Sequence, residues 1–380
     1  MELRMNSALD AVQKSGIRVF TQMARQEPGC LFLTLGEPDF DTPSPICQAA
    51  KDSLDAGETH YGENNGQLFL RKAISAFEQE KHGLQYAPEE IIVTVGATEA
   101  LFCALFGLLN PGDEVIVPTP AFGLYESIVK LCRGIYVPLD TRKAQFQITA
   151  EQLRSAITPR TKALILTSPN NPTGCIYSRE TIQAIHEVVR EHPLFLLCDE
   201  VYRDLADTED YESLSACSDL RPRLIVAQSF SKPYAMTGWR AGYLMADAPI
   251  IEQLSKVHQY AVVSVAPFVQ RACAEALRWD IAPMRETYRR RRDYVCARLT
   301  AMGLPYFRPQ GAFYVFPSIE SCGMDSVTFC TRLVKEGKLA CTPGSCFGAE
   351  GFIRISCCYS DEILREGMDR LEHFWSAVKP

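Results

Sequence analysis

Residues 229–243 read SFSKPYAMTGWRAGY and follow a short apolar run that has the composition of a buried strand. Lys232 stands among small residues, with serine hydroxyls three positions and one position before it and Arg240 eight positions after it. Ser229, Ser231 and Arg240 together offer two hydroxyl donors and one planar guanidinium, a donor set that can hold a phosphate. The stretch therefore indicates a strand that ends in a loop carrying a lysine and an anion site.

A lysine amine beside a phosphate site suggests one cofactor in particular. An amine can form an imine with a carbonyl group, and pyridoxal 5'-phosphate carries an aldehyde and a phosphate on one ring. Spacing alone leaves the alternative of an ordinary surface lysine and a distant arginine, since the chain contains 39 Lys and Arg residues. The rest of the chain can be tested against the cofactor interpretation.

The segment around Lys232 closely resembles the active-site lysine segment of the class I and II aminotransferases, which are fold-type I pyridoxal-phosphate enzymes. Further matches occur in the family's order from Gly36 to Arg354, so the resemblance covers essentially the whole chain. It implies that pyridoxal phosphate is the cofactor, that Lys232 is the catalytic residue and covalent anchor, and that Ser229, Ser231 and Arg240 bind the cofactor.

The composition excludes several other classes of protein. The chain of 380 residues is 47% hydrophobic and 22% charged, which is ordinary for a soluble globular protein. A net charge of −7 without a basic block argues against a nucleic-acid partner. The most apolar stretch, near residues 101–109, is too short to span a membrane. The 15 cysteines and six histidines show no metal-ligand spacing, so we expect no metal and reduced thiols in the cytoplasm.

Short apolar runs alternate with helical patterns through most of the chain. The runs cover residues 91–95, 114–117, 162–167, 194–198 and 223–226, and the main helical patterns cover 44–56, 66–82, 96–109 and 178–192. Strands that alternate with helices imply crossover connections and a mainly parallel sheet. The sequence therefore predicts a doubly wound α/β domain.

The pattern changes after about residue 285. We expect a long charged helix at residues 284–302, followed by a hairpin-like pair of apolar segments at 305–307 and 312–316. Another helix, two short strands and a final helix should follow. We predict a large cofactor-binding α/β domain over residues 46–284. The resemblance implies that residues 1–45 pack with residues 285–380 into a smaller, discontinuous α+β domain.

Two strand ends offer cofactor contacts, because parallel strands deliver functional residues at their carboxyl ends. Gly96, Ala97 and Thr98 form a strand-to-helix turn whose free N–H groups and helix dipole favour a phosphate; an ordinary turn capped by Thr98 is the alternative. Asp199 ends an apolar strand, where an unpaired carboxylate is costly. It can pair with a protonated pyridine nitrogen, which makes the ring an electron sink. Its neighbour Glu200 competes for this role, but strand alternation points it the other way.

The resemblance assigns further cofactor contacts. It places Phe122 against the cofactor ring, where stacking fixes the ring plane; an ordinary core aromatic is the alternative. In the turn at residues 168–174, Asn171 is expected to donate to the phenolate oxygen and to border the substrate, with a cis bond before Pro172. Tyr202 is expected to donate to the same oxygen and so to lower the pKa of the imine.

The substrate contacts follow from the resemblance as well. Arg354 interrupts a short apolar strand and is expected to clamp the substrate α-carboxylate, with a structural salt bridge as the alternative. Gly36 and Ile17 are expected to border the substrate, and Phe347 to line the pocket. No second arginine for a distal carboxylate is identified by motif.

Tyr61 carries the prediction of the assembly. The resemblance implies that Tyr61 reaches the phosphate of the neighbouring subunit, and a core aromatic is the alternative. If the tyrosine crosses the interface, the protein is an obligate homodimer with shared active sites.

We therefore expect a pyridoxal-phosphate-dependent aminotransferase with a ping-pong mechanism. It would move the amino group of an aromatic, aspartate-like or broader range of L-amino acids to a 2-oxo acid such as 2-oxoglutarate. Because a fold does not fix a reaction, a C–S β-lyase is the main alternative and a non-catalytic regulator is a remote one.

Overall fold

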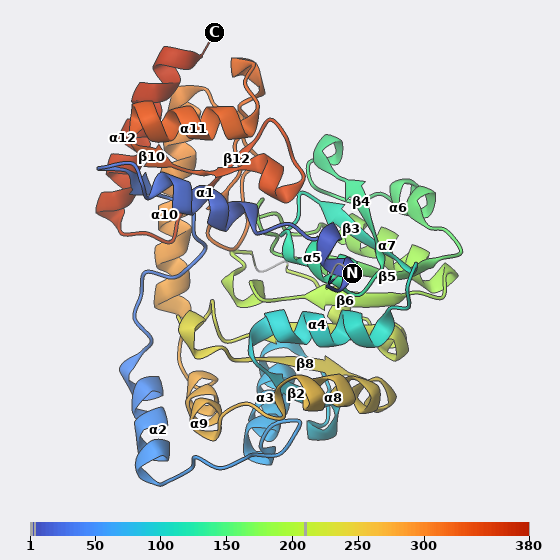
Figure 1. The fold of residues 1–380 in the computed structure, drawn as a ribbon. Coiled ribbons are helices and arrows are strands. Elements are labelled where there is room, and N and C mark those ends of the chain that lie inside the picture. Colours follow the sequence, from blue (N-terminus) through green and yellow to red (C-terminus); the bar gives the residue numbers. More distant parts are fainter. Residues whose placement is uncertain (1–2, 4, 209–210, 380) are drawn as a thin grey trace.

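A seven-stranded sheet forms the centre of the computed structural model, which describes residues 3, 5–208 and 211–379 (Figure 1). In sheet order its strands are β2 (Ile91–Thr94), β8 (Gly242–Ala246), β7 (Leu224–Ser229), β6 (Phe195–Asp199), β5 (Thr161–Thr167), β3 (Glu114–Thr119) and β4 (Ile135–Asp140). β8 is antiparallel to both of its neighbours, and the other pairs are parallel. The predicted fold-type I α/β architecture is confirmed.

Helices cover both faces of the sheet, because successive side chains of a buried strand point to opposite sides. In β6, Leu196 belongs to one apolar core and Leu197 to the other. The Leu197 core contains side chains of α4 (Gly96–Leu108), α5 (Leu124–Leu131) and α8 (Ala248–Val262). The Leu196 core contains side chains of α2 (Ser44–Asp55), α3 (Leu68–His82), α6 (Ala150–Ala156), α7 (Arg179–Glu191) and α9 (Pro267–Ala276).

A third core joins the two ends of the chain. Phe20 and Leu33 pack in it with residues such as Leu299, Phe329 and Trp375. Figure 1 shows the orange and red C-terminal elements gathered together, with the blue helix α1 lying across them. The elements here are α1 (Gly16–Ala24), β1 (Leu31–Phe32), α10 (Ala282–Met302), β9 (Tyr314–Val315), α11 (Ser326–Gly337), β10 (Leu339–Ala340), β11 (Thr342–Pro343), β12 (Ile353–Ser356) and α12 (Asp361–Val378). The boundaries of the two domains stay a prediction.

The structure differs from the sequence predictions at three places. β4 and β8 were not predicted: β4 is an edge strand with exposed residues, and β8 continues directly from the lysine segment. Residues 305–307 and 312–316 do not pair as the expected hairpin in the described structure: Tyr306 forms an isolated bridge with Pro317, just beyond the second segment, and β9 pairs with β12. Prolines around the first segment lack the N–H that a ladder needs. Three short strands, not two, follow α11.

Among the described residues, no helix has the length and apolar character needed to cross a membrane.

Candidate active site

One cavity of about 700 Å³ opens beside the carboxyl ends of the central strands. This volume lies within the range of roughly 300–1,000 Å³ that is typical of ligand pockets. The predicted cofactor residues that line it are Ala97, Thr98, Phe122, Asn171, Asp199, Tyr202, Ser229, Ser231, Lys232 and Arg240. The predicted substrate residues Ile17, Gly36 and Arg354 line it as well. Residues that are far apart in the sequence therefore meet in one cavity.

Gly96 and Arg240 are close together beside the position predicted for the phosphate. Gly96 has a φ of +73°, and a Cβ at this position would lie 2.7 Å from Nη2 of Arg240. The guanidinium thus packs against bare backbone at the amino end of α4. Nη1 of Arg240 donates to the carbonyl of Thr237 at 2.9 Å, and no acidic side chain of the described chain pairs with this arginine. A helix amino end beside an unpaired guanidinium fits a phosphate group.

Lys232 reaches across the cavity to the opposite wall. Its Nζ donates to the backbone carbonyl of Gly36 at 2.5 Å. Burial lowers the pKa of the Lys232 amine to about 8, the charges of Cys358 and Glu37 raise it, and Arg354 and Arg240 lower it further. About one tenth of an amine with this pKa is neutral at pH 7, and the neutral form is the nucleophile.

Asp199 lies at the end of β6, where only 5% of the residue is exposed. Its Oδ2 accepts a hydrogen bond from the Tyr125 hydroxyl at 2.6 Å, and its Oδ1 accepts from the Val201 N–H at 3.3 Å. Burial raises the pKa of Asp199 to about 6, while these two hydrogen bonds lower it and Glu200 raises it. No cation of the described chain pairs with Asp199, so a protonated ring nitrogen would supply the missing charge.

Thr167 extends the support behind Asp199. The Tyr125 hydroxyl lies 2.7 Å from Oγ1 of Thr167. Because its single hydrogen is directed to Asp199, the threonine is the donor in this second contact. The carboxylate is thereby fixed before any ligand arrives.

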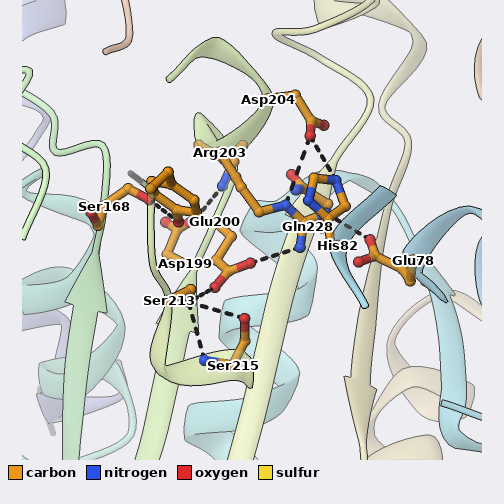
Figure 2. A network of polar contacts seen from close by, with 12 residues as sticks. Glu78, His82, Ser168, Asp199, Glu200, Arg203, Asp204, Ser213, Ser215 and Gln228 are labelled. Carbon is orange, nitrogen blue, oxygen red and sulfur yellow. Dashed lines mark hydrogen bonds and ion pairs between the residues drawn. The ribbon is translucent and has the colours of Figure 1, made fainter. Parts of the chain in front are cut away.

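The adjacent Glu200 belongs to a buried ionic network around Arg203 (Figure 2). Arg203 donates to Glu200 at 2.8 Å and to Glu78 at 2.8 Å, and its side chain is only 2% exposed. His82 lies 3.0 Å from Asp204 in the same network. Strand alternation therefore separates two consecutive carboxylates, Asp199 toward the cavity and Glu200 away from it.

Arg354 is the buried cation on the substrate side of the cavity. It is 2% exposed, and its guanidinium lies over the rings of Tyr314 and Phe347, at 4.5 Å and 4.8 Å from their centroids. Its Nη1 donates to Oδ1 of Asn171 at 2.8 Å, and its Nη2 donates to the carbonyl of Thr34. Its Nε has no hydrogen-bond partner. A buried fork with a free donor and no acidic partner among the described residues fits a substrate carboxylate.

Asn171 and two tyrosines complete the cavity wall. The bond before Pro172 is cis, as predicted. Because Oδ1 of Asn171 accepts from Arg354, its amide N–H groups remain free to donate into the cavity. The hydroxyls of Tyr202 and Tyr314 are 2.7 Å apart. A Cβ at residue 36 would lie 1.8 Å from the Tyr314 hydroxyl, so this position requires glycine.

Sequence reasoning missed several cavity residues. Tyr125 and Tyr314 give no local signal that separates them from ordinary core aromatics, and only their hydroxyl partners show their role. Arg18 on α1 and Arg25, the residue directly after α1, also line the cavity, although neither was predicted as a site residue. Tyr61 does not line it and is 89% exposed, so its expected contact with a second subunit stays a prediction.

Comparisons with known proteins agree on the family. The family described as "Aminotransferase class I and II" matches residues 28–371. The chain is 41% identical to a probable N-acetyl-LL-diaminopimelate aminotransferase of Bacillus subtilis, with 98% of this chain and 96% of that protein covered. It is 40% identical to an aspartate aminotransferase of Pyrococcus abyssi, with 97% and 98% covered. The structure of an aspartate aminotransferase from Thermus thermophilus with maleate superposes with a TM-score of 0.93 at 35% identity and covers 98% and 100%.

Proposed function

The chain belongs to the class I and II aminotransferases, and we propose that it moves the amino group of an L-amino acid to a 2-oxo acid by a ping-pong mechanism centred on Lys232. Members of this family depend on pyridoxal phosphate, and the chain is an aminotransferase that uses this cofactor. Because the chain belongs to a family of enzymes, we do not propose the alternative of a non-catalytic regulator. The observation that carries the residue roles is the convergence of Lys232, Asp199, Arg240 and Arg354 on one cavity.

The cofactor would be held by four kinds of contact. Arg240, the serines Ser229 and Ser231, and the amino end of α4 at Ala97 and Thr98 would hold the phosphate. Phe122 would stack on the ring. Asn171 and Tyr202 would donate to the phenolate oxygen. Asp199, fixed by Tyr125, would pair with the ring nitrogen and keep it protonated.

The substrate would be held and deprotonated by two side chains on opposite walls. Arg354 would bind the α-carboxylate through its planar fork, and Asn171 orients the fork. Lys232 would act as the general base that removes the proton from the substrate Cα. Bound pyridoxal phosphate supplies the electron sink that stabilises negative charge at that carbon. Burial of the Lys232 amine favours its neutral, basic form.

We also propose a homodimer with shared sites. Tyr61 is exposed on a single chain, and other large side chains are exposed as well, including Tyr260, Phe106 and Val263. Burying such side chains against a second copy would remove apolar surface from water. For the location we propose the cytoplasm, because all 15 cysteines are free thiols and reducing compartments preserve thiols.

The test is an absorbance spectrum of the purified holoenzyme before and after adding single amino acids without an acceptor. We expect loss of the cofactor's resting band and release of one equivalent of 2-oxo acid. Stable absorbance, with ammonia and pyruvate released from cysteine conjugates, would move the protein to the C–S lyases. Absence of a cofactor band after adding pyridoxal phosphate would overturn the role of Lys232.

A further inference from the structure

A buried histidine of α8 contacts the helix that carries the predicted phosphate site. His258 is 0% exposed and follows Ile251 and Leu254 on the buried face of α8, which packs in the same core as α4. A polar ring in such an apolar position is costly unless its nitrogens find partners. Both do: Nδ1 lies 2.6 Å from Oε1 of Glu99, and Nε2 lies 2.8 Å from the backbone carbonyl of Asn64.

These two partners fix the charge of the ring. A backbone carbonyl can only accept, so Nε2 of His258 carries a hydrogen. A carboxylic acid is a stronger acid than an imidazolium ion, so the proton between Nδ1 and Glu99 belongs to the ring. His258 is therefore a cation and Glu99 an anion. Within the described residues, His258 is the one cationic side chain that pairs with Glu99.

Glu99 stands where an uncompensated negative charge would oppose a phosphate. It lies in the first turn of α4, three residues after Gly96, which is roughly 4.5 Å along the helix axis. Its Oε2 accepts a hydrogen bond from the Val95 N–H, so the carboxylate is held at the amino end of the helix. A carboxylate at this end takes up the helix field that favours anions, and it repels a second anion bound there.

Arg240 gives a second reason to hold Glu99 away. Its guanidinium lies beside Gly96, and no acidic side chain of the described chain pairs with it. A Glu99 carboxylate without a partner would compete with a ligand for this guanidinium, because opposite charges within a few ångströms attract strongly in a partly buried site. The pair with His258 removes that competition.

We propose that His258 is a positioning residue for the cofactor phosphate: its positive charge neutralises Glu99 and so leaves the amino end of α4 and Arg240 available to a phosphate group. This inference rests on the proposed function, because it takes the phosphate to bind at that end. His258 does not line the cavity, so it is not a catalytic residue. Its charge should matter for a ligand with a phosphate and not for the same ring without one.

The test compares pyridoxal 5'-phosphate with pyridoxal, which lacks the phosphate, on the full-length protein freed of cofactor. His258→Gln keeps an amide donor for the Asn64 carbonyl and removes the charge. We expect it to weaken binding of pyridoxal phosphate about 5- to 30-fold, the effect of one charge at a partly buried helix terminus, and that of pyridoxal less than about twofold. Inorganic phosphate, measured by calorimetry, should follow pyridoxal phosphate. Adding Glu99→Gln should restore phosphate binding to within about threefold of wild type, because the charge that needed a partner is gone.

His186→Gln is the matched control, because His186 on α7 also lies 3.0 Å from a carboxylate, that of Asp219, and does not line the cavity. Equal losses for pyridoxal phosphate and pyridoxal in His258→Gln would indicate a purely structural role and overturn the proposal. So would no loss for either ligand.

The single variant Glu99→Gln decides the question if His258→Gln does not fold. It should bind pyridoxal phosphate at least as tightly as wild type, and weaker binding would contradict the proposal. Failure of the proposed function looks different, since wild type would then develop no Lys232-bound absorbance band with either pyridoxal phosphate or pyridoxal.

Discussion

Two sides of the cavity differ in how their charged groups are held. We call the side around Asp199 at the end of β6 the floor, and the side with Arg18 and Arg25, at α1, the wall. On the floor, Asp199 is buried at a strand end, and both carboxylate oxygens already accept hydrogen bonds from Tyr125 and Val201. On the wall, Arg18 and Arg25 are exposed and have no partner within the described chain. A carboxylate that is already held by hydrogen bonds suits a chemical step that is the same for every substrate. The wall carries charges that no described side chain neutralises, so the folded chain depends little on them.

The floor should be far more sensitive than the wall to substitution. The largest expected effect comes from Lys232→Ala, which removes both the covalent anchor and the base. We expect turnover to fall by about 10⁴-fold or more, the upper range for a general base, together with loss of the cofactor's resting absorbance. Steady-state turnover and a spectrum of the same sample measure the two effects. Near-normal activity would reject the assignment of Lys232.

Asp199→Asn should rank second, because it keeps the shape of the floor and removes its charge. Removing one preorganised electrostatic group typically costs about 10²- to 10³-fold in rate, and we expect a loss of that size in kcat. Single-turnover measurements at saturating cofactor separate this loss from weaker cofactor binding. An unchanged rate with full cofactor occupancy would show that the ring nitrogen does not need this carboxylate.

Arg203→Met tests whether the network behind the floor serves stability or chemistry. Arg203 pairs with Glu78 and Glu200 while almost fully buried. Breaking one partner of a buried pair typically costs about 3–5 kcal/mol, so the unfolding free energy should fall by that amount. Activity per folded molecule should change much less than in Asp199→Asn. Urea unfolding measures the unfolding free energy, and turnover divided by the concentration of titrated active sites measures the activity per folded molecule. A rate loss equal to that of Asp199→Asn, without loss of stability, would contradict this division.

The smallest of the expected effects is the change in the rate of cofactor binding with each unit of pH. Burial lowers the pKa of the Lys232 amine to about 8. Only the neutral amine attacks the aldehyde, so the capture rate should rise up to about tenfold per pH unit below 8 and level off above it. Stopped-flow absorbance after mixing apoprotein with pyridoxal phosphate measures this profile. A rate that keeps rising to pH 10 would show that the amine is not perturbed.

The floor could be predicted from sequence because its residues stand in local patterns. Asp199 ends an apolar run, Gly96 to Thr98 form a strand-to-helix turn, and Lys232 lies in a dense segment of hydroxyl and small residues. Each pattern carries its own physical reason. Tyr125 and Tyr314 could not be identified, because a tyrosine in an apolar segment looks the same whether its hydroxyl meets a carboxylate or only packs in a core.

The sequence by itself predicted the alternation of strands and helices from periodicity, and it predicted the cofactor and the residues that should hold it from short motifs and their resemblance to the aminotransferase family. Strand alternation already predicted that Glu200 points away from Asp199, but only the tertiary structure decided that Glu200 pairs with Arg203 and that Arg18 lines the cavity. The physical reason is the same in both cases. The direction of a charged side chain is set by which face of its element the cores bury, and those cores are assembled from segments far apart in the chain.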